Sequence, residues 1–150
     1  MLIAVGIGSI ILSAVAMLSL YSARSFVAMG NYMDLDRASR NALDQMSRDI
    51  RQTTGLKTYS TTALEFNKPD GTTLKYDWSP STRRLTCTQN GTAKVLLSQC
   101  DFLQFNISQR NPSNGVFGFY PAANNPAICK LVDVSWRCSR TIFGQKVNTE

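Results

Sequence analysis

Twenty-three residues without a charged side chain open the chain: MLIAVGIGSIILSAVAMLSLYSA, residues 1–23. Most of them are Leu, Ile, Val, Ala or Met. As an α-helix this stretch would be about 34 Å long, since each residue adds roughly 1.5 Å. The hydrocarbon core of a bilayer is about 30 Å thick, so we expect the stretch to span a membrane. The alternative, a helix buried in a soluble core, is less favoured because so small a chain seldom buries so long an uncharged helix.

Residues 24–53 continue this helix in amphipathic form, with one glycine, Gly30, and no proline. Charges of alternating sign recur every four residues on one helix face, and apolar residues occupy the opposite face. The charges are Asp36, Arg40, Asp44 and Arg48. The apolar residues expected to pack the helix against a sheet are Leu35, Ala42, Leu43, Met46 and Ile50.

No turn signal separates the two halves, so we predict one helix from about residue 2 to residue 52. It would be roughly 75 Å long, more than twice the thickness of the bilayer core. One half must therefore leave the membrane and pack on another part of the chain. We expect the helix to end near Thr53-Thr54-Gly55, with glycine as the terminator.

Beyond the helix, the pattern changes to short alternating strands. Turn residues at Pro69-Asp70-Gly71 and Asn90-Gly91 predict two hairpins, and residues 111–126 predict a long loop. The strands are expected at residues 63–66, 73–78, 84–88, 94–97, 103–107 and 130–143. In the last of them one face should carry Val132, Val134, Trp136 and Cys138.

One long helix followed by five or six antiparallel strands predicts an α+β fold. We divide the chain into a transmembrane half of the helix (1–23), an amphipathic half (24–54) and an antiparallel β-sheet head (55–150). About 95 residues follow the helix, which is enough for a modest core if the apolar stripe of the helix completes it.

Composition argues against an enzyme. Histidine is absent, which excludes His-dependent nucleophiles and His-ligated zinc. The phosphate-binding motifs G-x-x-x-x-G-K-[ST] and G-x-G-x-x-G are also missing. The net charge is +6, but no basic cluster exceeds Arg83-Arg84, so we expect a solvated surface rather than nucleic-acid binding. We expect no catalytic residue, cofactor, metal ion or small-molecule substrate.

Four cysteines lie in the expected head, and their spacing fits neither a zinc ribbon nor a redox C-x-x-C motif. Disulfides in an oxidising compartment are favoured, with three possible pairings. The alternative is four small buried apolar side chains. The disulfide candidates are Cys87, Cys100, Cys129 and Cys138.

At this level the chain resembles the type IV pilin-like proteins, and among them the minor pseudopilins of type II secretion systems. Met1-Leu2-Ile3-Ala4-Val5-Gly6-Ile7 is similar to the residues that follow the conserved glutamate of the prepilin motif. Residues 43–52, LDQMSRDIRQ, are similar to the helix of J-type minor pseudopilins and W-type minor pilins. Residues 95–97 and 102–105 fit the strand pattern of that group. The resemblance covers the first 55 residues well and the rest loosely.

One departure from the family is clear at the start of the chain. The family's recognition sequence is Gly-aromatic-Thr-Leu-aliphatic-Glu after a basic leader, and position 5 here is Val5. We expect that the true start precedes Met1 and that a further C-terminal strand follows Glu150, in preference to a subunit lacking the site.

The resemblance implies an inner-membrane protein of a bacterium, with a single span and a periplasmic head. Counting basic residues beside the span favours the opposite topology, because Arg24 and Arg37 follow it and none precedes it. We follow the family topology, which the cysteines of the head also favour, since a basic leader would reverse the count.

Two functions remain open. The first is a structural subunit of a pseudopilus or pilus that assembles through its helix, with membrane lipid, other pilin-like subunits and the assembly machinery as partners. The second is an anchored periplasmic binding module that does not polymerise. In the first, small residues would let neighbouring spans approach closely. The residues assigned to span and assembly are Leu2, Ile3, Val5, Gly6, Gly8, Ile10, Ile11, Ala14, Val15 and Leu18.

Overall fold

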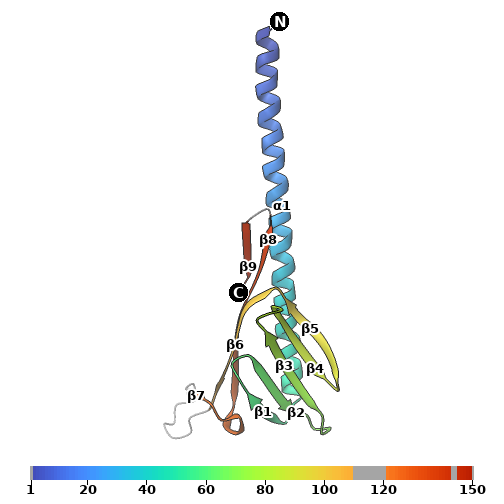
Figure 1. Cartoon of the computed structure of the whole chain (residues 1–150), viewed down its shortest axis with the longest axis vertical. Helices are drawn as coiled ribbons and strands as arrows, with labels where there is room; N and C mark the ends of the chain where they lie inside the picture. The colour runs from blue at the N-terminus through green and yellow to red at the C-terminus, as the bar shows by residue number, and fades with distance from the viewer. Residues whose placement is uncertain (1, 110–120, 143–144, 150) are drawn as a thin grey trace.

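A single uninterrupted helix, α1 (Leu2–Arg51), forms the first third of the molecule. The computed structural model describes residues 2–109, 121–142 and 145–149, with side chains for 3–109 and 121–141. The N-terminal half of α1 extends away from the rest of the chain, and its C-terminal half lies beside the strands (Figure 1). The prediction of one long helix is confirmed.

The helix ends without the predicted help from Gly55. Its last turn tightens through bonds from the Gln52 amide to the Asp49 carbonyl, 3.1 Å, and from the Thr53 amide to the Ile50 carbonyl, 3.0 Å. The Thr53 hydroxyl donates to the same Ile50 carbonyl at 2.7 Å. Gly55 instead begins the first strand, and its φ is not positive. Thr53, two residues before the predicted glycine terminator, thus donates to one of the last carbonyl groups of the helix.

The strands form two antiparallel sheets, so the α+β prediction is confirmed. The larger sheet has the order β1-β2-β3-β4-β5, and the smaller has β7-β6-β8-β9. Their bounds are β1 (Gly55–Tyr59), β2 (Ala63–Asn67), β3 (Thr73–Ser79), β4 (Arg84–Gln89), β5 (Thr92–Ser98), β6 (Cys100–Ser108), β7 (Ala122–Ala123), β8 (Leu131–Ile142) and β9 (Gln145–Thr149). A 3-10 turn, η1 (Pro126–Ile128), precedes β8.

All six predicted strands are present, and the structure adds three within its described residues: β1, β7 and β9. The predicted loop 111–126 lies outside the described residues up to position 120; the remainder contains β7 and the start of η1. Asn90 (φ 52°) and Gly91 (φ 77°) make the predicted tight turn between β4 and β5. Both positive φ values match a type I′ hairpin turn.

The core lies where the two sheets and the lower half of α1 meet. Leu103, Phe105 and Ile107 of β6 are buried, as their alternation predicts. The helix contributes Leu35, Ala42 and Met46 to the same cluster. Ile50 packs against it at partial burial. The sheet residues that complete the core include Leu64, Phe66, Leu74, Tyr76, Leu85 and Leu97.

Leu43 is a correction to the predicted packing stripe, because its side chain is 49% exposed. At 3.6 residues per turn it lies about 80° around the helix from Leu35, at the margin of the contact. The position nearer the centre of the stripe belongs to Ser39, which is buried. Ser39 was not predicted to lie in the packing stripe, because the stripe was defined by apolar residues alone.

Candidate membrane span and its junction with the head

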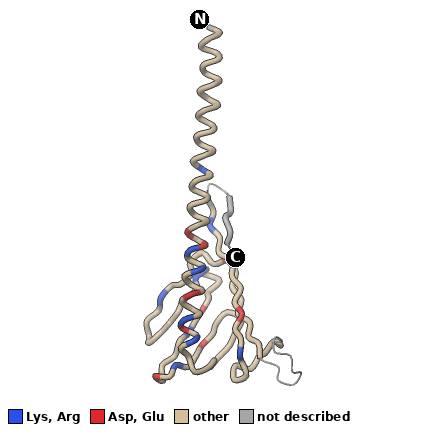
Figure 2. Tube along the Cα trace, turned by 180° about the vertical axis from the view of Figure 1, so that it is seen from behind, with Lys and Arg blue, Asp and Glu red and all other residues tan. Residues whose placement is uncertain are grey.

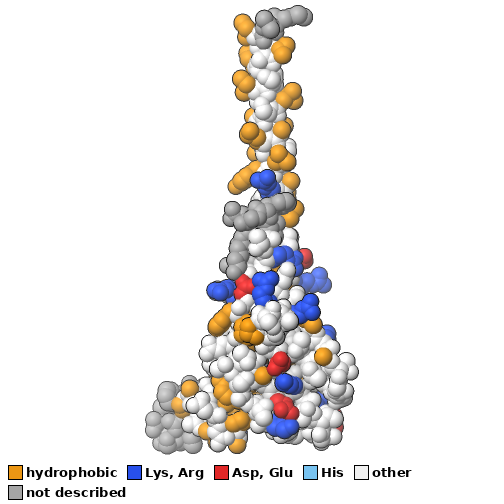
Figure 3. All heavy atoms as spheres, in the orientation of Figure 1, with side chains coloured by type: hydrophobic (Ala, Val, Ile, Leu, Met, Phe, Trp, Pro, Cys, Tyr) orange, Lys and Arg blue, Asp and Glu red, His pale blue; other side chains and the backbone are white. Residues whose placement is uncertain are grey.

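The upper half of α1 presents apolar side chains on every side. Within the described residues, one helix, Ile3–Arg51, is long and apolar enough to cross a membrane, and its apolar window is not buried at all by the rest of the chain. Figure 3 shows orange apolar side chains along the visible face of the shaft, above the uppermost basic side chain. The predicted span residues Ile3, Val5, Ile10, Ile11, Val15 and Leu18 are all exposed.

Two serine hydroxyls of this segment are bonded inside the helix. The Ser9 hydroxyl donates to the Gly6 carbonyl at 2.8 Å, and the Ser13 hydroxyl donates to the Ser9 carbonyl at 2.5 Å. Hydrocarbon offers no hydrogen-bond partner, so a hydroxyl bonded to its own helix is compatible with a membrane span.

The small predicted assembly residues leave an open surface. A Cβ built on Gly6 or Gly8 would meet no heavy atom within 4 Å. Neither glycine is therefore required by a contact within the chain. Small residues let adjacent spans approach closely, and Gly6 and Gly8 provide this on opposite sides of the helix, about 200° apart.

Aromatic side chains mark the lower end of the apolar segment, a feature that the sequence reasoning missed. Tyr21, Phe26 and Tyr32 are all exposed and flank Arg24, the first charge of the chain. Tyrosine and arginine favour the membrane–water boundary, where an apolar body and a polar tip are both accommodated. The aromatic residues on either side of the first charge were the sequence signal that could have located this lower end.

Below this boundary α1 carries its charges, and they lie beside the sheets (Figure 2). Arg40 Nε pairs with Asp36 at 2.9 Å, which joins two of the charges that recur every four residues. The Arg140 guanidinium donates to the Asn31 side chain at 2.5 Å and to Gln99 at 2.9 Å. These bonds attach β8 and the β5–β6 connection to the middle of the helix.

Two further bonds fix the helix onto the sheets at buried positions. The Trp136 indole donates to the Ser39 hydroxyl at 3.2 Å. The Tyr76 hydroxyl donates to the Asp49 carboxylate at 3.3 Å. Burial, then the neighbouring Cys87 thiol and the negative charge of Asp49, raise the pKa of Tyr76 far above its usual range. Asp49, the one charge near the apolar stripe, thus has a buried donor as its partner.

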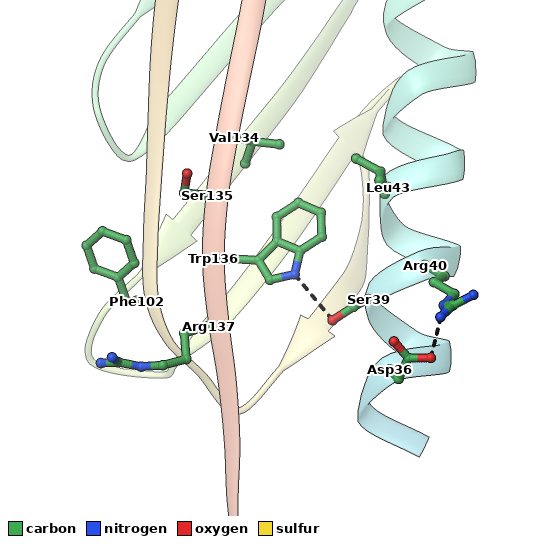
Figure 4. Close-up of a pocket in the computed structure, with 9 residues that line it drawn as sticks. All are labelled: Asp36, Ser39, Arg40, Leu43, Phe102, Val134, Ser135, Trp136 and Arg137. Carbon is green, nitrogen blue, oxygen red and sulfur yellow. Dashed lines mark hydrogen bonds and ion pairs between the residues drawn. The ribbon is translucent and has the colours of Figure 1, made fainter. Parts of the chain in front are cut away.

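A groove of about 680 Å³ runs between α1 and β8. Figure 4 shows Leu43 and the Trp136 indole facing each other across it, with Asp36 and Arg40 at one end. Phe102 and Arg137 lie on the far side of the β8 ribbon. A second hollow of about 620 Å³ shares Leu43 and Val134 with the first. The groove is mainly apolar, and it contains no clustered carboxylates.

The cysteines are free throughout the described part of the chain, so no disulfide is confirmed. Cys87, Cys100 and Cys138 are buried and Cys129 is half-buried. Among the described residues, no group of three or more His, Cys, Asp or Glu side chains is placed to hold a metal ion.

The chain matches no protein-family model, no curated protein and no solved structure. The fold and the apolar segment still define a class: an α+β protein whose single N-terminal helix is able to cross a membrane.

Proposed function

We propose that the chain is a membrane-anchored structural subunit, similar to the minor pseudopilins, that assembles into a pilus-like filament through the upper half of α1. One observation carries this proposal: a continuous helix is apolar and unburied in one half and bonded to the head in the other. A membrane anchor alone needs no rigid connection to its head. A filament subunit does, because the packing of its helix must set the position of its head.

In this proposal the span stays in the bacterial inner membrane, with the head in the periplasm, until the subunit joins a bundle of similar helices. Apolar side chains then exchange lipid contacts for contacts with neighbouring spans, at little cost in hydrophobic burial. Close packing at small residues provides the attraction. Gly8 and Ala14 are suited to this because both lie on an open helix surface.

Replacing Gly8 and Ala14 with leucine tests the packing step. We expect the double variant to fold its head and enter the membrane normally, but to lose incorporation into filaments. Intrinsic fluorescence of Trp78 and Trp136 reports the fold of the head. Unchanged incorporation would contradict the proposal.

Crosslinking distinguishes assembly from the alternative, an anchored binding module that does not polymerise. Leu12→Cys and Leu18→Cys place reactive thiols on the exposed span. A ladder of crosslinked subunits in membranes supports assembly. Val95→Cys, an exposed site on β5, is the matched control for random collision.

The groove between α1 and β8 favours the binding module as a second candidate. It is large enough for a small apolar ligand or a peptide side chain, since such sites are about 300 Å³ or more. A ligand that protects Trp136 fluorescence from quenching, together with the absence of a crosslinked ladder, would favour this candidate.

A further inference from the structure

Two of the four cysteines lie directly opposite each other in the smaller sheet. Cys100 begins β6, and its register partner in the antiparallel strand β8 is Cys138. Both side chains are buried, with 0% and 1% of their surface exposed. The other thiols have different neighbours: Cys87 is paired with Tyr76 and Lys94 in the larger sheet, and Cys129 donates to the Leu131 carbonyl.

The backbone hydrogen bonds show whether Cys100 and Cys138 form a hydrogen-bonded or a non-hydrogen-bonded pair of the antiparallel ladder. The Ser139 amide donates to the Gln99 carbonyl at 3.0 Å, so the neighbouring pair is hydrogen-bonded. The Cys100 amide donates to Arg83 instead of to β8. Cys100 and Cys138 therefore occupy a non-hydrogen-bonded position, where opposing Cα atoms are about 4.5 Å apart. Disulfides need Cα atoms about 4.4–6.8 Å apart, so the two residues can be joined without moving either strand far.

We propose that Cys100 and Cys138 form a disulfide when the head folds in the presence of a disulfide oxidant, and that Cys87 and Cys129 remain thiols. One cysteine thiolate attacks a sulfur of the oxidant R–S–S–R and releases RS⁻. The second thiolate attacks the resulting mixed disulfide, forms the Cys100–Cys138 bond and releases the second RS⁻. The protein loses two electrons and two protons, and the oxidant becomes two RSH.

Burial places this step during folding. In the folded head both side chains are almost fully buried, so no oxidant can reach the pair. The contact between the two thiols raises the pKa of Cys100 and lowers the pKa of Cys138. Thiol–disulfide exchange needs both access and a thiolate. Both are available before β6 and β8 close under α1.

The bond would secure the strand on which the helix rests. Cys138 contacts the hydroxyl of Ser39, and Trp136 on the same strand face donates to that hydroxyl. Next to the pair, the Ser139 hydroxyl donates to Asp101, which also accepts from Arg83. A crosslink here constrains the unfolded chain and keeps β6 and β8 in register beneath the helix.

The test uses the full chain, denatured and reduced, then refolded in detergent micelles with a mixture of oxidised and reduced glutathione. Free thiols are alkylated, and the digested protein is analysed by mass spectrometry. We expect one linked peptide pair, Cys100–Cys138, with Cys87 and Cys129 alkylated. Any other predominant pairing, or four alkylated cysteines, would overturn the proposal.

Matched variants control for folding. Cys87→Ser with Cys129→Ser keeps the pair, and its melting temperature should fall by about 10 °C or more when dithiothreitol is present during refolding. Cys100→Ala with Cys138→Ala should show no dependence on dithiothreitol. If the melting temperature of the Cys87→Ser, Cys129→Ser variant were also independent of dithiothreitol, the proposal would fail. The outcome is independent of filament assembly, because no second subunit takes part.

Discussion

At the scale of single residues, the packing of α1 depends on which side chain occupies the centre of the stripe. Met46 is almost fully buried, whereas Leu43 is half exposed. Hydrophobic pattern alone treats both as core residues, because each lies on the apolar side of the helix. Only the contacts separate them: Met46 meets the core cluster, and Leu43 lines the groove beside Trp136.

Met46→Ala should therefore lower the free energy of unfolding by about 2–5 kcal/mol, since it leaves a cavity in the core. Leu43→Ala is its matched control and should cost less than about 1 kcal/mol, because much of its surface is already in water. Denaturant unfolding in micelles, followed by tryptophan fluorescence, measures both. Equal losses would mean that Leu43 belongs to the core after all.

Glu65 makes the stability of the folded state depend on pH in the acidic range. A hydrogen bond from Lys57, 2.7 Å long, lowers the pKa of Glu65 below its ordinary value of 4.5. A carboxyl with a lowered pKa stabilises the folded state above that ordinary value, and the contribution is lost as the pH falls through the folded-state pKa. The side chain is 23% exposed, so solvent screening keeps the contribution below about 1 kcal/mol.

The measurement compares wild type with Glu65→Gln. We expect wild type to be the more stable by a few tenths of a kcal/mol near pH 6, an advantage that disappears near pH 3. An advantage that stays constant across this range would show that the ion pair with Lys57 does not carry it.

At the scale of elements, the sequence predicts what periodicity can express. The helix, the six alternating strands and the Asn90-Gly91 hairpin are confirmed because each depends on local spacing. The polar, bulged strand β1 and the two-residue strand β7 are missed because pairing with neighbours, and not their own pattern, makes them strands. The division into two sheets follows Gln99, whose φ of 62° is uncommon for a residue with a side chain.

The features of the candidate site also fall into those that local sequence predicts and those that depend on the fold. The apolar span could be predicted, since its signal lies in consecutive residues. Ser39 could not, because its partner Trp136 is distant in sequence and only the fold brings the two together. The opposition of Cys100 and Cys138 was likewise hidden among three equal pairings until the register of β6 and β8 was known.

Continuity of α1 can be broken at Gly30, between the span and the head. Proline there removes one backbone bond and clashes with the preceding turn, at a local cost of about 3 kcal/mol. Gly30→Pro should leave the head folded and the protein in the membrane but abolish filament incorporation. Gly30→Ala is the control, because a Cβ at this position meets nothing within 4 Å. Incorporation of the proline variant at the wild-type level would show that the rigid connection is unnecessary.

At the scale of the whole molecule, the described chain divides into an apolar region and a charged region, and the boundary between them lies near Tyr21 and Arg24. Above it, apolar side chains are exposed, and none of the described residues elsewhere in the chain covers them. In water so large an apolar surface would drive aggregation. In lipid it would be the stable arrangement, and the charged residues lie along the chain below it (Figure 2).

Arginine in the middle of the span tests this division. Each arginine at the centre of a membrane helix costs about 2.5–3.5 kcal/mol of insertion free energy. The double variant Leu12→Arg, Val15→Arg should therefore leave the membrane fraction, with the fluorescence of its head unchanged. Val95→Arg adds the same charge to an exposed position on β5 and should stay in the membrane fraction. If the double variant remained in the membrane through alkaline extraction, the upper half of α1 would not be the anchor, and the filament proposal would lose its starting point.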